Sequence, residues 1–211
     1  MSAQPEPVGT AVAAASPQLV QFRGSKIARG LLRLAGWRVD FDGLPGLQGV
    51  IAVYPHTSNW DFIVGLLAKW TMGIQVRFWG KDSLFKVPGF AAWMRWLGGV
   101  AINRKTSSGV VGHTINEMNS ARAENRLFWL VLAPEGTRSL TKGWRSGFYR
   151  VAHGANVPLV VATIDYGRRV VNLREMLMLS GDAEADMAAI ARCVGAASGH
   201  RPELAAPIKL V

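Results

Sequence analysis

Short apolar runs alternate along the chain with longer segments in which apolar residues recur every three to four positions. Short runs bounded by turn-forming residues are typical of buried strands, and the longer periodic segments are typical of amphipathic helices. The predicted strands are residues 37–41, 49–54, 75–79, 127–133, 159–165 and a short strand around residue 170. The predicted helices are residues 25–35, 60–72, 85–97, 108–125, 146–154 and 184–197. This alternation predicts an α/β fold in which helices flank a central, mostly buried β-sheet.

The spacing of these elements predicts one domain. Residues 1–17 are rich in alanine, proline, serine and glycine, and we expect a flexible N-terminal tail there. Residues 18–211 then carry the elements without a second linker or an internal repeat, which predicts a single domain. Even a long apolar run such as residues 155–164 falls short of the roughly 20 residues that a spanning helix needs, so no segment is expected to cross a membrane.

The first predicted helix is basic and amphipathic. Basic and apolar residues fall on two different faces, with Lys26, Arg29 and Arg33 on one and Ile27, Leu31 and Leu34 on the other. Such a helix suits an anionic membrane surface. An ordinary packed helix with a solvated basic face explains the same pattern, and both interpretations stay open here. Aromatic residues also gather between residues 78 and 96, which suits a membrane interface, an acyl-binding groove or core packing.

The charge balance favours anionic partners. Lysine and arginine number 24 against 14 aspartate and glutamate residues, giving a formal net charge of +10. Such a charge suits acidic lipids, phosphorylated substrates or an acidic carrier protein. The basic residues are dispersed and match no nucleic-acid-binding motif, so a nucleic-acid partner is not expected. The single cysteine, Cys193, allows no internal disulfide, which indicates a reducing, cytosolic compartment, and no residue cluster has metal-ligand spacing.

One histidine lies where chemistry is expected. His56 follows the predicted strand 49–54 and heads the string HTSNWD, which ends at Asp61. Side chains at the carboxyl ends of sheet strands project into the crevice where α/β proteins bind ligands. If His56 lies in the turn and Asp61 in the first helical turn, the chain can fold back and pair them. The carboxylate would then fix the imidazole tautomer and leave the other ring nitrogen as a general base. This is the logic of a catalytic triad without a serine of the protein, so the nucleophile would be a substrate hydroxyl.

A second string, PEGTRS at residues 134–139, follows the predicted strand 127–133. Gly136 lets the backbone approach a ligand, Thr137 offers a hydroxyl and Arg138 offers a fork for phosphate. Glu135 could accept a hydrogen bond from a polyol or hold the arginine. Lys81 and Arg104 are two further basic residues that follow strand-like segments, and together with Arg138 they would form a phosphate pocket. Each basic residue taken singly could equally be a solvated surface charge.

Together these strings resemble a known family. HxxxxD at residues 56–61, GGVAINR at 98–104, PEGTRS at 134–139 and VPLV at 157–160 are similar, in order and spacing, to the glycerolipid acyltransferases typified by 1-acylglycerol-3-phosphate acyltransferases. The resemblance covers roughly residues 35–170, and the HTSNWDF version looks like a short bacterial subgroup. It implies an α/β sheet with the histidine in a cleft and an apolar groove for an acyl chain.

The resemblance also implies roles for the site residues. His56 would deprotonate the hydroxyl of a lipid acceptor, Asp61 would orient His56, and the hydroxyl would attack the thioester of acyl-CoA or acyl-carrier protein. Glycerol phosphate would be held by the residues that match the family's binding positions, namely Lys81, Arg104, Glu135, Gly136, Thr137 and Arg138. No cofactor and no metal are implied. The expected location is the cytoplasmic side, with the protein peripherally associated with the inner face of the membrane.

The sequence departs from the family pattern at several positions. Ala133 stands where an aromatic residue is usual, Asn103 stands where an acidic residue is common, and no second proline follows VPLV. These departures leave the acceptor open between a lysophosphatidate, a lyso-aminolipid and another lipid alcohol. A catalytically inactive membrane-binding protein and a hydrolase that uses the same pair on water are alternatives of other classes; the absence of a G-x-S-x-G elbow disfavours a serine hydrolase.

Overall fold

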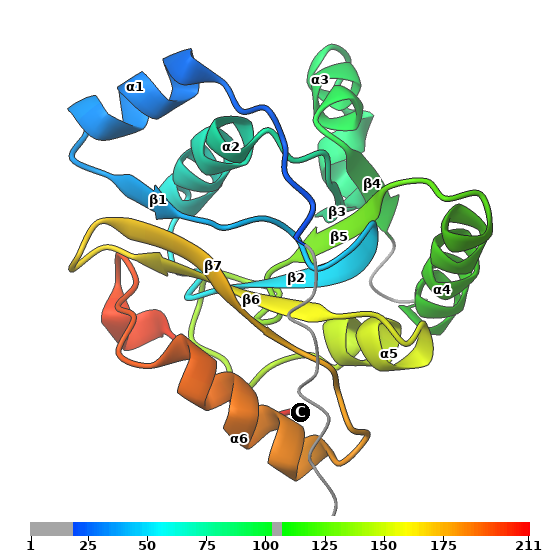
Figure 1. The fold of residues 1–211 in the computed structure, drawn as a ribbon. Coiled ribbons are helices and arrows are strands. Elements are labelled where there is room, and N and C mark those ends of the chain that lie inside the picture. Colours follow the sequence, from blue (N-terminus) through cyan, green and yellow to red (C-terminus); the bar gives the residue numbers. More distant parts are fainter. Residues whose placement is uncertain (1–18, 103–106) are drawn as a thin grey trace, which may run out of the picture.

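The computed structural model describes residues 19–102 and 107–211, and within them the chain forms one mixed sheet flanked by helices (Figure 1). The spatial order of the strands is β1-β7-β6-β2-β5-β3-β4. Only the β6–β7 pair is antiparallel, and all the other neighbouring pairs described are parallel. The strands are β1 (Arg38–Asp40), β2 (Gln48–Tyr54), β3 (Arg77–Lys81), β4 (Gly99–Ile102), β5 (Phe128–Leu132), β6 (Leu159–Asp165) and β7 (Val170–Leu177). The predicted α/β fold is therefore confirmed.

Helices cover both faces of this sheet. The helices are α1 (Lys26–Leu34), α2 (Trp60–Met72), α3 (Phe90–Trp96), α4 (Ser107–Ala123), α5 (Gly147–Gly154) and α6 (Ala183–Val194), with short 3₁₀ turns at Asp82–Lys86 and Pro202–Leu204. One core lies between the sheet and α1 and α2, and the other lies between the sheet and α4, α5 and α6. Figure 1 shows α1 and α2 on the opposite side of the sheet from α5 and α6. No described helix is long and apolar enough to cross a membrane.

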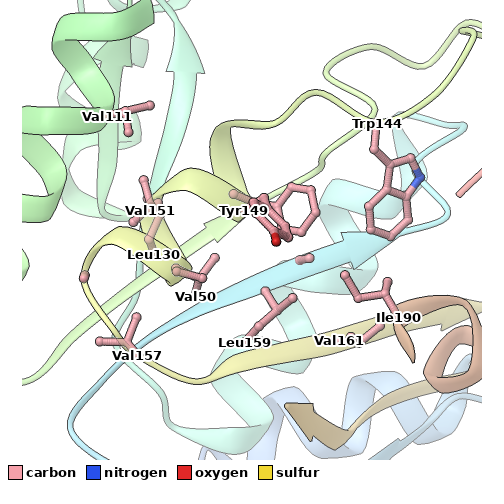
Figure 2. Close-up of a cluster of buried hydrophobic side chains, with 14 of the residues drawn as sticks. Val50, Val111, Leu130, Trp144, Tyr149, Val151, Val157, Leu159, Val161 and Ile190 are labelled. Carbon is pink, nitrogen blue, oxygen red and sulfur yellow. The ribbon is translucent and has the colours of Figure 1, made fainter. Parts of the chain in front are cut away.

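The strand β2 shows why the central runs are apolar throughout. Val50, Ala52 and Tyr54 face the α4–α6 core, while Ile51 and Val53 face the core under α2. Because alternate side chains point to opposite faces and both faces are covered, consecutive residues from Val50 to Tyr54 are all apolar. Figure 2 shows part of the α4–α6 core, where side chains from the central strands gather with residues from the α5 region and from α6.

Three predictions about elements need correction or extension. The helix predicted over residues 85–97 is a 3₁₀ turn followed by α3, because Pro88 disfavours helical backbone at Val87, whose ψ is 115°. The strand-like segment before Arg104 is the edge strand β4, which covers Gly99–Ile102. The short strand predicted around residue 170 extends to Leu177 and pairs with β6 along its length. The tail predicted over residues 1–17 lies outside the described residues.

Candidate active site

Four neighbouring parallel strands end at one edge of the sheet, and the candidate site lies at that edge. In the register of the sheet, Ala52 of β2 pairs with Leu132 of β5, and Tyr54 of β2 pairs with Thr163 of β6. The strand β3 joins β5 on the far side from β2. The loops that follow these strands therefore meet, and they carry the HTSNWD string and the PEGTRS string, while Lys81 is the last residue of β3. This is the edge at which parallel sheets bind ligands.

The structure brings His56 and Asp61 together. The ring atom Nδ1 of His56 lies 3.3 Å from Oδ2 of Asp61, which also accepts backbone hydrogen bonds of 2.8 Å from Thr57 and from Ser58. Asp61 lies in the first turn of α2 and reaches back over the turn that precedes the helix. Asn59 occupies the N-cap position without a side-chain cap bond, whereas the Ser58 hydroxyl accepts from the N–H of Trp60. The carboxylate of Asp61 thus holds the whole turn, not the histidine alone.

The electrostatics of this pair suit a general base. The Asp61 side chain is 1% exposed and the His56 side chain 20%. Burial raises the pKa of Asp61, but hydrogen bonds from the histidine ring, a backbone N–H and a tyrosine hydroxyl outweigh it, so that pKa lies below its ordinary value. An ionised carboxylate beside Nδ1 favours the tautomer that carries its proton there. The Nε2 atom of His56 is then the atom with a free lone pair.

Glu135 lies behind His56 rather than in the wall of the cavity. Its side chain is buried, and its two oxygens accept hydrogen bonds from the backbone N–H of His56 at 2.6 Å and from that of Ala206 at 2.9 Å. Burial raises its pKa above the ordinary value. The predicted contact of Glu135 with glycerol phosphate stays a prediction. Through these two hydrogen bonds, Glu135 connects the PEGTRS loop to the histidine turn and to the C-terminal segment.

A cavity of about 750 Å³ opens beside the pair and is lined by His56 and Asp61. Its apolar wall includes Phe62, Leu66 and Met72 of α2 as well as strand residues. Since residues near both ends of α2 line it, the cavity runs along a helix of 13 residues, a length of roughly 20 Å at about 1.5 Å per residue. A largely apolar cavity that extends along a helix and includes a histidine–aspartate pair in its lining suits a substrate with a long hydrocarbon chain.

Basic side chains line the same cavity. Of the predicted binding residues, Lys81, Gly136, Thr137 and Arg138 line it, and Arg104 lies outside the described residues. Among the described salt bridges, none involves Lys81 or Arg138. These positive charges near the candidate base suit an anionic group of a substrate.

Sequence reasoning missed two kinds of site residue. Arg145 and Arg150 also line the cavity, although both follow the PEGTRS string by several residues and belong to no motif. The hydroxyl of Tyr166 donates to Oδ1 of Asp61 at 2.9 Å. One feature of the sequence could have pointed to Tyr166, since it directly follows the predicted strand 159–165. The strand order that brings Tyr166 to Asp61 is not visible in the sequence.

Comparison with known proteins now decides the family. The family profile described as "Acyltransferase" matches residues 38–165, which include both loops of the site and the strands that hold them. The chain belongs to the acyltransferase family. Among curated protein sequences no significant match to this acyltransferase is found.

The solved structures include a similar fold. The crystal structure of the 1-acyl-sn-glycerophosphate (LPA) acyltransferase PlsC from Thermotoga maritima matches with a TM-score of 0.51 and 20% sequence identity. The match covers 80% of this acyltransferase and 74% of the Thermotoga chain. At this identity the likeness concerns the fold, and it agrees with the single α/β sheet described above.

Proposed function

We propose that this acyltransferase moves a fatty acyl group from acyl-CoA or acyl-carrier protein to the hydroxyl of a lysophospholipid such as 1-acylglycerol-3-phosphate. The observation that carries the proposal is the His56–Asp61 pair in the lining of a largely apolar cavity that is also lined by basic residues. The pair supplies a base, the apolar wall suits acyl chains, and the basic residues suit a phosphate. The acyltransferase family and the PlsC-like fold support the same reaction class.

The chemistry needs no nucleophile from the protein. Nε2 of His56 takes the proton of the acceptor hydroxyl as its oxygen attacks the thioester carbon. The carbon–sulfur bond of the tetrahedral intermediate then breaks, and the sulfur leaves with the proton from Nε2, giving an ester and a free thiol. Asp61 stays ionised and stabilises the imidazolium between these two transfers.

In this proposal the acceptor phosphate lies near Arg138, Lys81 and Arg145. All three line the cavity, and Arg138 follows Gly136, whose φ of 68° lets the loop turn sharply beside the Arg145 side chain. Arg104 is proposed to join them. A phosphate-free lipid alcohol is the alternative acceptor, and it would gain nothing from these cations.

We also propose that the enzyme works at the cytoplasmic face of a bacterial membrane as a peripheral protein. Support comes from α1, which packs on the domain through Ala28 and Leu32. The apolar residues Ile27, Leu31 and Leu34 are 79%, 51% and 88% exposed, so they are not the packed face of an ordinary helix. An exposed apolar stripe beside a basic stripe suits an anionic lipid surface.

Thiol release tests the reaction. Wild type, His56→Ala and His113→Ala are assayed with acyl-CoA and with acyl-carrier protein, with and without lysophosphatidate. His113 serves as the control because its side chain is 74% exposed on α4. We expect release that requires the acceptor and falls about 10²- to 10⁴-fold in His56→Ala only, since that is what general-base catalysis contributes.

The other outcomes discriminate between the alternatives. Release without any acceptor indicates a thioesterase. Release only with a phosphate-free lipid alcohol overturns the lysophosphatidate proposal but keeps acyl transfer. No release with either donor and any lipid acceptor indicates an inactive membrane-binding protein.

A further inference from the structure

Tyr166 directly follows β6, the neighbour of β2 in the sheet, and its side chain contacts Asp61. The strand β6 pairs with β2 on the side opposite β5, and Thr163 lies beside Tyr54 in that pairing. Tyr166 therefore leaves the sheet close to the turn that carries His56. Its hydroxyl donates a 2.9 Å hydrogen bond to Oδ1 of Asp61. The proposed base pair is thus held by a residue outside both motifs.

The two oxygens of Asp61 have separate partners. Oδ2 faces Nδ1 of His56 and accepts from two backbone N–H groups, whereas the described partner of Oδ1 is the hydroxyl of Tyr166. The terminal torsion of an aspartate is broad and carries little intrinsic preference. A carboxylate held through one oxygen can therefore pivot, and a second bond to the other oxygen limits that pivoting.

The tyrosine ring is itself held in place. It packs edge-to-face against Trp37, with ring centroids 4.9 Å apart, and edge-to-face against His200, at 5.0 Å. Its backbone N–H donates to the carbonyl oxygen of Ser198 at 2.8 Å. Contacts from the start of the domain and from the C-terminal segment thus aim the hydroxyl at Asp61.

We propose that Tyr166 is a positioning residue for the proposed acyl transfer, because its hydroxyl fixes the Asp61 carboxylate in the orientation that keeps Oδ2 on Nδ1 of His56. The inference rests on the proposed function in one respect, since acyl transfer is the reaction in which the positioned His56 would act. Burial and the hydrogen bond to Asp61 raise the pKa of Tyr166, so the hydroxyl stays protonated and remains a donor at physiological pH.

The substitution Tyr166→Phe tests this role because it keeps the ring and removes the hydroxyl. We expect kcat to fall about tenfold, the size of effect expected from losing a hydrogen bond to a charged group. The KM of donor and acceptor should stay unchanged, since Tyr166 does not line the cavity. Tyr149→Phe is the matched control: it removes a tyrosine–aspartate bond of 2.7 Å, to Asp186, away from the site. It should leave kcat unchanged.

A second readout separates positioning from stability. In protein labelled with ¹⁵N-histidine, the ring nitrogen shifts of His56 report the fraction of the Nδ1–H tautomer, and they are assigned by comparison with His56→Ala. We expect that fraction to fall in Tyr166→Phe and to match wild type in Tyr149→Phe. If the role of Tyr166 were merely structural, Tyr166→Phe would lower the unfolding midpoint as Tyr149→Phe does, and the ring nitrogen shifts of His56 would stay unchanged.

The measurement also distinguishes this inference from the proposed reaction. The tautomer is measured without substrate, so it tests the positioning role even if acyl transfer is not found. Unchanged His56 shifts in Tyr166→Phe would overturn the inference, as would a wild-type kcat. In a His56→Ala background, Tyr166→Phe should cause no further loss of activity, because the two residues act as one unit.

Discussion

At the scale of single residues, the site depends on buried carboxylates that hold backbone as well as side chains. Asp61 accepts from two N–H groups of the turn after β2, and Glu135 accepts from the N–H of His56 itself. The histidine is therefore fixed through its ring and through its main chain. Both carboxylates are nearly inaccessible to solvent. Removing one hydrogen-bond acceptor in such surroundings leaves a buried donor unsatisfied, at a cost of about 1–3 kcal/mol.

Glu135→Gln tests whether this residue positions His56 or binds substrate. A glutamine offers one oxygen and one amide group, so it can accept from only one of the two N–H groups that Glu135 now serves. We expect a loss of about 1–3 kcal/mol in the free energy of unfolding, measured in urea, and a roughly tenfold lower kcat. Glu203→Gln, an exposed change in the C-terminal segment, is the control. A raised KM for the acceptor with unchanged kcat would instead support the predicted substrate contact.

At the scale of the elements, α2 contributes both to the proposed catalytic pair and to the cavity. Its first turn holds Asp61, and the face that continues from there lines the apolar channel. Gly65 lies one turn after Asp61 and lines the channel, and a Cβ atom added there would meet nothing within 4 Å. The glycine thus leaves open the space that an acyl chain would occupy in the proposed reaction.

Gly65→Leu is expected to shorten the chains that the enzyme accepts. Replacing a glycine inside a helix with leucine favours the helix by several tenths of a kcal/mol, so the melting temperature should not fall. The side chain enters the channel, so activity with hexadecanoyl donors should drop at least about tenfold while octanoyl donors keep theirs. Gly112→Leu makes the same change in α4, at an exposed position outside the cavity. Equal losses with both donors would argue against the channel as the acyl site.

The pattern of apolar residues predicts the central strands of the sheet, because these strands are buried on both faces. Unbroken apolar runs make up residues 50–54 of β2, all of β5 and residues 159–162 of β6, and the turn after β2 was predicted to pair His56 with Asp61. The edge strand β4 is short and half exposed, so the sequence marks it only as a strand-like segment before Arg104. The contacts of Tyr166, Arg145 and Glu135 depend on strand order and on the C-terminal segment, which single-sequence periodicity does not contain.

At the scale of the whole molecule, exposed apolar residues gather on one side. Large exposed hydrophobic residues occur on α1, on α2 and on α3, and none occurs on the described parts of α4, α5 and α6; those on the first three are Ile27, Leu31, Leu34, Trp60, Ile63, Phe90, Trp93 and Trp96. The three helices are neighbours. The helix α1 packs on α2, and the ring of Phe62 in α2 packs edge-to-face on that of Trp93 in α3, with the ring centroids 6.1 Å apart. The cavity is next to this apolar side, because residues of α2 line it and Leu84, just before α3, is both exposed and part of its lining.

Vesicle binding tests the proposed membrane side directly. We expect wild type to sediment with phosphatidylglycerol vesicles more than with phosphatidylcholine vesicles, and less as salt rises, because the basic stripe of α1 meets anionic lipid. Ile27→Ser combined with Leu34→Ser should weaken binding about a hundredfold or more, since burying each side chain contributes roughly 1.5–3 kcal/mol.

The matched control removes exposed apolar residues elsewhere. Leu140→Ser combined with Met178→Ser changes two side chains that are 58% and 54% exposed and lie outside α1, α2 and α3. That variant should bind vesicles as wild type does. Both pairs should keep wild-type kcat on detergent-dispersed substrate, because none of the four residues lines the cavity. Equal binding by the two double variants would show that α1 does not meet the lipid, whatever the outcome of the acyl-transfer assay.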